Sequence, residues 1–118
     1  MVKLLLTHTR NDITKPWVTV NAETTHSDMF TPQEINILIA TKSAIDSLPG
    51  YLSSSESFPD NNTYVVEMQF DTLANAEHAK DSLINPPANS LLELRKLLIN
   101  QKRNSLGVDY NITLDIIE

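Results

Sequence analysis

Residues 31 to 84 carry the sharpest structural signals in the chain, and they describe a helix, a β-hairpin and a second helix. Thr31-Pro-Gln-Glu34 has the composition of a capping box with proline at the first helical position, and Leu48-Pro-Gly50 ends the helix that it opens. Pro59-Asp-Asn-Asn62 predicts a turn between two strands, and Asp71-Thr72 predicts the start of the second helix. This α-β-β-α unit limits the chain to a few arrangements.

Strand patterns flank the unit and complete a larger plan. Val2 to Thr9 alternates between a more apolar and a more polar side, and so does Tyr110 to Ile117. Within the unit, Thr63 to Asp71 buries one side only, whereas the serine-rich Tyr51 to Phe58 suits an edge strand. The order β-α-β-β-α-β predicts an α+β, ferredoxin-like fold, with one antiparallel sheet and its helices on one face. Many unrelated functions use this fold.

A third helix is predicted before the last strand, where the basic plan does not require one. Ser90 and Glu93 repeat the capping-box pattern, and the helix ends before Gly107. Apolar side chains at helical spacing indicate its packing face: Leu91, Leu94 and Leu98, with the neighbours Leu92, Leu97 and Ile99. The helix also carries four cations, which we interpret as a solvated helix end: Arg95, Lys96, Lys102 and Arg103.

Composition narrows the functional classes. A chain of 118 residues fits one domain, and we expect residues 1–118 to form it. The absence of cysteine excludes disulfides and thiolate catalysis, and the net charge of -6 disfavours nucleic-acid partners. His8, His26 and His78 lack metal-ligand spacing, so no metal site is predicted. The apolar run Met1-Val-Lys-Leu-Leu-Leu6 is too short for a signal peptide or a membrane span, so we expect a cytoplasmic protein without membrane partners.

The predicted topology gathers five side chains at one end of the sheet. The first strand lies between the third and fourth and runs antiparallel to both, which brings His8 towards Tyr64 and Tyr110. Arg10 and the loop that holds Trp17 hang over the same end. We predict that these residues bind an amphipathic ligand carrying a carboxylate or a carbonyl. The alternative is that the tyrosines and the histidine only fill the core, with their polar atoms satisfied.

The segment from residue 11 to residue 30 has little regular pattern. A stretch of this length is unusual inside a compact domain, and such loops are often lids or binding segments. We therefore expect it to lie near the site.

Two runs resemble the dimeric α/β barrel superfamily, and within it the antibiotic-biosynthesis monooxygenase-like proteins. They are Leu48-Pro-Gly-Tyr-Leu52, before the hairpin, and Phe70-Asp-Thr-Leu-Ala-Asn-Ala-Glu77, where a strand gives way to an alanine-rich helix. The resemblance implies a homodimer through the sheet face, with small molecules held between each sheet and its helices. We predict no cofactor.

The chain differs from this family at the positions of the family's catalytic residues. The monooxygenase-like members commonly use an asparagine on the first strand and a tryptophan near the third, whereas this chain has His8 with its threonine neighbours on one and Met68 and Phe70 on the other. Haem-degrading relatives place a histidine on the second helix. His78 lies in that element but faces away from its predicted apolar stripe, Leu73 and Ala76, which favours an exposed side chain.

Three functional hypotheses follow. The first is a non-catalytic, dimeric binding protein for a small apolar or amphipathic molecule. The second is a cofactor-independent monooxygenase-like enzyme on the same scaffold. The third is a pure interaction module with a filled core. The departures from the family's catalytic residues place the binding protein ahead of the enzyme.

Overall fold

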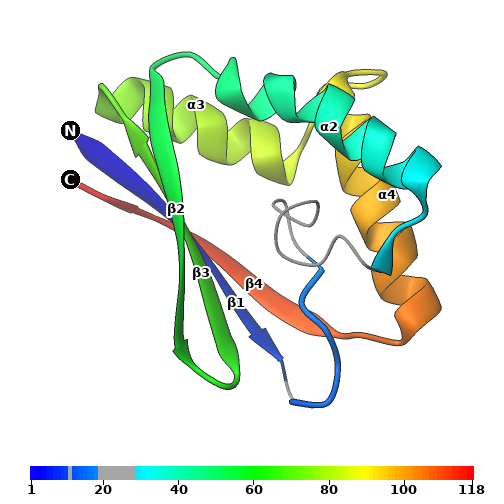
Figure 1. The fold of residues 1–118 in the computed structure, drawn as a ribbon. Helices are drawn as coiled ribbons and strands as arrows, with labels where there is room; N and C mark the ends of the chain where they lie inside the picture. Colours follow the sequence, from blue (N-terminus) through cyan, green and yellow to red (C-terminus); the bar gives the residue numbers. More distant parts are fainter. Residues whose placement is uncertain (11, 19–28) are drawn as a thin grey trace.

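A computed structural model describes residues 1–10, 12–18 and 29–118, and within them it has the predicted order of elements (Figure 1). The elements are β1 (Val2–Arg10), α2 (Pro32–Asp46), β2 (Tyr51–Asp60), β3 (Thr63–Phe70), α3 (Leu73–Ile84), α4 (Leu91–Leu106) and β4 (Tyr110–Ile117). Residues 11 and 19–28, which include His26 and much of the predicted lid or binding segment, lie outside the described residues.

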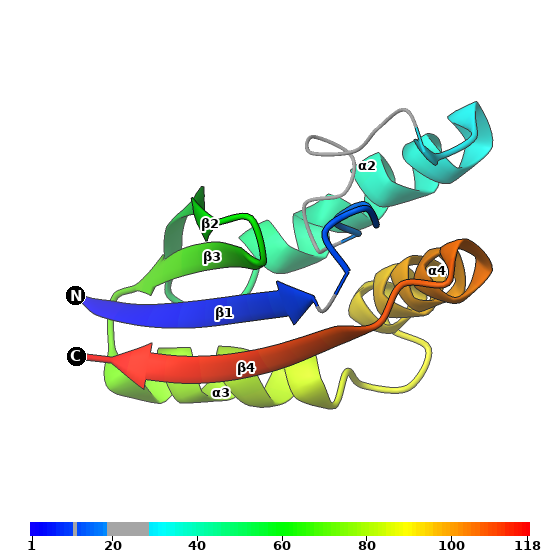
Figure 2. The ribbon, with the colours of Figure 1, turned by 90° about the horizontal axis from the view of Figure 1, so that it is seen from below.

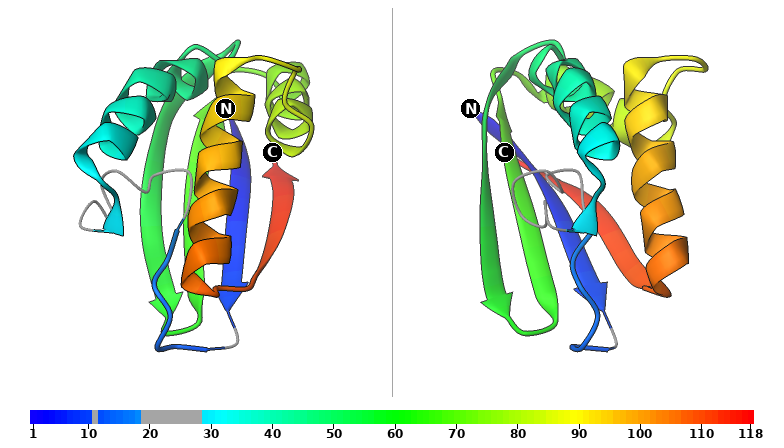
Figure 3. Two further views of the ribbon diagram at one scale, coloured as in Figure 1. Left: turned by 90° about the vertical axis from the view of Figure 1, so that its right-hand side faces the viewer. Right: turned by 45° about the vertical axis from the view of Figure 1, so that its right-hand side comes forward.

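The strands form one antiparallel sheet in the order β2-β3-β1-β4, which confirms the ferredoxin-like plan. All three described helices lie on one face of this sheet, and the other face is free of helices (Figure 3). β1 occupies the predicted position between β3 and β4, where His8 pairs with Tyr64 on one side and with Ile112 on the other. The register therefore sets which side chains of the three strands share the helix-facing side.

The two edges of the sheet differ. β2 is exposed along almost its whole length, and two register shifts interrupt its pairing with β3, as suits the predicted edge strand. β4 is the opposite edge; it contacts α3 and begins just after the end of α4 (Figure 2). Its side chains alternate between half-buried and exposed, so its helix-facing row is only partly covered.

The predicted helix boundaries have the expected chemistry. Thr31 and Glu34 form the full capping box of α2, with backbone-to-side-chain distances of 2.9 and 3.2 Å. Ser90 caps α4, but the Glu93 side chain accepts from the backbone of Asn89 and not from that of Ser90, so the second box is only half formed. Gly107 ends α4 in the left-handed conformation, with φ +67°.

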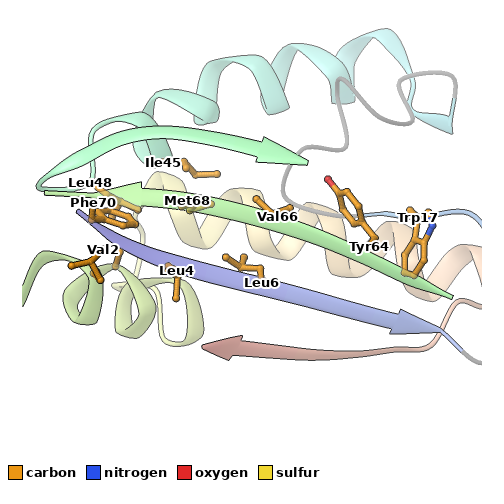
Figure 4. Packing of buried hydrophobic residues seen from close by; sticks show 12 residues of the cluster. Val2, Leu4, Leu6, Trp17, Ile45, Leu48, Tyr64, Val66, Met68 and Phe70 are labelled. Carbon is orange, nitrogen blue, oxygen red and sulfur yellow. The ribbon is translucent and has the colours of Figure 1, made fainter. Parts of the chain in front are cut away.

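The core lies between the sheet and the helices (Figure 4). Alternate residues of β1 and β3 fill it together with Trp17, Ile45 and Leu48. Small residues of α3 let that helix approach the sheet closely: Ala76, Ala79 and Ser82. Leu73, predicted to share this stripe, is instead 39% exposed, because the helix has only just begun there and its first turn extends beyond the core.

No helix of the described residues is long and apolar enough to cross a membrane.

Candidate functional site

The structure brings the five predicted site residues together at the end of β1. The ring centroids of His8 and Tyr64 are 5.2 Å apart, and Trp17 lies 5.8 Å from Tyr64 and 5.2 Å from Tyr110. The Arg10 guanidinium stands 4.3 Å from the centre of the Trp17 ring. The strand register and the loop after β1 together produce this cluster.

The hydroxyl groups of both tyrosines form hydrogen bonds with other groups of the protein. The Tyr64 hydroxyl donates to a carboxylate oxygen of Glu56 at 2.5 Å. The Tyr110 hydroxyl donates to the Pro16 carbonyl and accepts the Val18 N–H at 2.8 Å. These bonds tie the loop to the sheet, and burial also raises the pKa of Tyr110. The two hydroxyls thus have structural partners, and ligand binding by them stays a prediction.

Arg10 is likewise held by the protein. Its guanidinium donates to the carbonyls of Lys15 and Asn61, the latter at 2.8 Å, while its flat face covers Trp17. The contacts join the loop after β1 to the β2–β3 hairpin. A ligand-binding role for Arg10 and Trp17 also stays a prediction.

A cavity of about 220 Å³ lies on the other side of His8, between the sheet and the helices. Its floor comes from β1 and β4, and its walls come from the three helices. The apolar lining is Leu6, Ile45, Leu83, Ile84, Pro86, Leu92, Ile99, Ile112 and Leu114, and the polar lining is His8, Ser82, Arg95, Lys96, Asn100 and Arg103. Of the five predicted site residues, His8 belongs to this described lining and the other four lie outside it.

The lining carries one sign of charge. It contains Arg95, Lys96 and Arg103, and none of its described members is an aspartate or a glutamate, in a chain of net charge -6. All three cations come from α4, the helix that the basic plan does not require. The cavity therefore favours an anionic group over a cationic one.

Arg95 contradicts the interpretation of the α4 cations as a solvated helix end. Its side chain is 2% exposed, and its guanidinium donates to the Leu38 carbonyl and to the Thr41 hydroxyl, the latter at 3.4 Å. Those groups belong to α2, so Arg95 joins two helices. The guanidinium can be buried here because α2 supplies acceptors for its N–H groups.

The apolar pattern of α4 predicts its packing face only in part. Leu91 and Leu94 are exposed, and the buried residues are Ile99, one of the predicted neighbours, and Arg95. The sequence held a signal for the true face, since Arg95, Ile99 and Arg103 recur every four residues, the spacing of one helix face. The more numerous leucines on the other sides of the helix masked it.

Arg103 and Lys96 donate hydrogen bonds to backbone carbonyls. The Arg103 Nε donates to the Val18 carbonyl at 2.6 Å, and its guanidinium lies 4.9 Å from the centre of the Tyr110 ring. Lys96 Nζ donates to the Ile84 carbonyl at 2.7 Å. Among the described residues, no carboxylate forms an ion pair with Arg103, and burial lowers its pKa. Arg103 thus brings a half-buried positive charge to the cavity.

His8 is neutral at neutral pH. Its pKa falls from 6.5 to about 4, first because burial disfavours the charged ring and second because the positive charge of Arg103 is near. The carbonyls of Tyr64 and Leu6 act in the opposite direction with a smaller effect. The floor of the cavity therefore holds an uncharged imidazole beside a charged guanidinium.

Comparison with known proteins identifies the fold. The structure matches SnoaB from Streptomyces nogalater, a cofactor-independent oxygenase, at 10% identity and a TM-score of 0.50, over 99% of this chain and 90% of that one. It also matches proposed antibiotic biosynthesis monooxygenases from Deinococcus radiodurans (17% identity, TM-score 0.47, 100% and 91% of the two chains) and Nitrosomonas europaea (11%, 0.45, 100% and 97%).

This chain has a ferredoxin-like fold, which it shares with SnoaB. No protein-family model matches its sequence, and no curated protein matches it either. At 10% identity the likeness to SnoaB concerns the fold alone. The chemistry of the site must be argued from this chain's own residues.

Two further details of the site bear on that chemistry. His78 on α3 is exposed, as the helical pattern predicted, and it is not part of the described cavity lining. Within the described residues, no group of three or more His, Cys, Asp or Glu side chains could hold a metal ion. The ionisable side chains of the described lining are the His8 imidazole and the three cations of α4.

Proposed function

We propose that this protein binds a small amphipathic molecule, bearing a carboxylate or a carbonyl, in the cavity between its sheet and its helices. The observation that carries the proposal is the lining itself: an apolar chamber with three cations and no described acid. Apolar walls with a few placed polar groups are the usual composition of small-molecule sites.

The charge of Arg103 supports an anionic ligand in particular. Among the described residues, the partners of this half-buried guanidinium are a carbonyl and an aromatic face, which compensate its charge only in part. A ligand carboxylate could form the charge-assisted hydrogen bonds that this cation lacks. The same reasoning disfavours amines and other cations as ligands.

The size of the cavity limits the ligand. A volume of about 220 Å³ is below the range of roughly 300–1,000 Å³ for pockets that hold drug-sized molecules. We therefore expect a compact acid, such as a single aromatic ring with a short side chain or a medium-length aliphatic acid. A cavity of this size also counts against the alternative of a module with a filled core.

The second candidate is a cofactor-independent oxygenase on the same scaffold. The favouring observation is the neutral His8 at the cavity floor, because an uncharged imidazole can accept a proton from a bound substrate. SnoaB, which shares the fold, is such an oxygenase. Oxygen uptake with a broad panel of phenolic substrates tests this candidate, and absence of turnover across the panel counts against it.

We also propose a homodimer through the free face of the sheet. That face carries half-buried or exposed polar side chains, including Thr7, Glu67 and Asp115, and no described helix covers it. Such a polar face would make a modest, hydrated interface. Sedimentation analysis tests the proposal, and a monomer at all accessible concentrations would contradict it.

Native mass spectrometry of the purified protein, compared with its denatured mass, is the first test of binding. A co-purifying acid would support the proposal and would report its mass together with the stoichiometry. Titration calorimetry with medium-length aliphatic acids and aromatic acids is the second test. A protein that binds none of them contradicts the proposal.

Two variants locate the binding site. Lys96→Met removes an exposed cation of the cavity rim, and Arg103→Met removes the half-buried one. Each should weaken acid binding by about ten-fold or more, the value of a hydrogen bond to a charged group. Lys80→Met on α3 removes the same charge outside the described lining and serves as the matched control. Equal affinities for all three variants would place the ligand elsewhere.

A further inference from the structure

The two ring nitrogens of His8 differ in their hydrogen bonding. His8 Nδ1 lies 3.2 Å from the Tyr64 carbonyl oxygen, the partner residue across the β1–β3 pair. A carbonyl oxygen only accepts hydrogen bonds, so Nδ1 carries the proton. Since the ring is neutral, Nε2 has a free lone pair and is an acceptor.

This acceptor has no partner in the described part of the protein. The described backbone groups that interact with the imidazole are the carbonyls of Tyr64, which contacts Nδ1, and of Leu6. Carbonyl oxygens only accept hydrogen bonds, so neither of them can donate to Nε2. The side chain is 1% exposed, yet it lines the cavity. Buried acceptors are rarely left unpaired, because an unpaired group loses its hydration without compensation.

The other polar groups of the cavity cannot take the same role. Lysine and arginine side chains are donors only, so Lys96 and Arg103 suit a carboxylate or a carbonyl and cannot accept from a ligand. Ser82 and Asn100 can each donate or accept, so they impose no requirement. Among the side chains of the described lining, the Nε2 atom of His8 is the one polar group that is restricted to accepting.

We infer that His8 is a specificity-determining residue, whose Nε2 accepts a hydrogen bond from a hydroxyl group of the ligand, so that the ligand is a hydroxylated acid and not a plain hydrocarbon acid. This inference rests on the proposed function, because it concerns the same cavity. The cations of α4 bind the acidic group of the ligand, and the strand histidine selects for the hydroxyl.

A matched series of ligands tests the inference by titration calorimetry. The probes are cinnamic acid and its ortho, meta and para derivatives, each as the hydroxy and the methoxy compound. One hydroxy isomer should bind about two- to ten-fold more tightly than cinnamic acid, the range expected for one net hydrogen bond. Its methoxy counterpart has nearly the same shape but no donor and should lose the gain.

The His8→Phe variant links the gain to the histidine. It keeps a ring of similar size on the cavity floor and removes both nitrogens. The affinity of the variant for cinnamic acid sets its own baseline, and relative to that baseline the preference for the hydroxy isomer over its methoxy counterpart should disappear. A preference that persists in the variant would overturn the assignment to His8.

Nitrogen NMR of the imidazole tests the inference on the wild-type protein, should the variant fail to fold. The ligand-free spectrum should show the tautomer protonated at Nδ1, and the hydroxy acid should shift the Nε2 signal. A ring protonated at Nε2, or equal affinities for every hydroxy and methoxy isomer, would overturn the inference while the proposed function stands. Binding of no acid at all would refute both together.

Discussion

The buried histidine makes the stability of this fold depend on pH in a defined window. In the unfolded chain His8 titrates near 6.5, whereas in the folded chain its pKa is about 4. Between these two values the unfolded chain binds more protons than the folded one, so the free energy of unfolding falls as the pH falls. Above this window His8 is neutral in both states and has no effect. Below this window the free energy of unfolding has fallen by the full amount that His8 causes.

The two pKa values also set the size of the effect. A shift from 6.5 to about 4 corresponds to a loss of about 2.5 kcal/mol in the free energy of unfolding between roughly pH 7.5 and pH 4.5. Small domains are stable by only about 5–15 kcal/mol. One buried imidazole should therefore account for a visible part of the acid sensitivity of this protein.

Urea denaturation at a series of pH values measures the effect. The carboxyl groups titrate in the wild type and in the His8→Phe variant alike, so the difference between the two isolates the imidazole. The variant should be less stable at neutral pH, because the Tyr64 carbonyl loses its partner, and it should recover about 2.5 kcal/mol relative to the wild type by pH 4.5.

The His78→Gln variant replaces a histidine that lies outside the core and serves as the matched substitution control. Stability curves of the wild type and His8→Phe that stay parallel within about 0.5 kcal/mol would refute the reasoning. They would mean that His8 is not buried as a neutral ring.

The remaining predictions concern local geometry. Gly50→Ala places a Cβ 2.8 Å from the Asn75 Cβ at φ +74°, whereas Gly107→Ala at φ +67° meets open space apart from a lysine tip. Thermal unfolding should show a loss of about 1–2 kcal/mol for Gly107→Ala and a larger loss for Gly50→Ala, so equal losses would contradict the close approach. Tyr64→Phe removes the hydroxyl bond to Glu56 and should cost about 1 kcal/mol with little change in acid binding. A large loss of binding would place Tyr64 in the site.

Sequence reasoning succeeded where the physical cause is local. The capping of α2 by Thr31 depends on the side chain of one residue and the backbone a turn away, and Gly107 is needed because α4 ends in the left-handed conformation. The alternation of Leu4, Leu6 and His8 depends only on the period of a strand. Such signals lie within a few residues of each other, so the chain displays them before it folds.

The strand order allowed one step beyond local structure. Because the ferredoxin-like plan brings the end of β1 beside the starts of β3 and β4, it predicted the meeting of His8 with Tyr64, and the Trp17 loop joins them there. The strand order could not predict whether the side chains around His8 and Tyr64 would leave a cavity between them. That depends on how each ring packs, and here the space opened on the far side of His8.

The sequence by itself determined the elements, their order and the alternation that buries His8, because caps, turns and strand periods act over short distances along the chain. Only the tertiary structure decided which face of α4 turns inward. Leucines lie on several sides of that helix, and its packing against α2 buries Arg95 and Ile99 while Leu94 stays exposed. That choice places the cations in the cavity, because the orientation of a helix with leucines on several sides depends on the elements that it packs against.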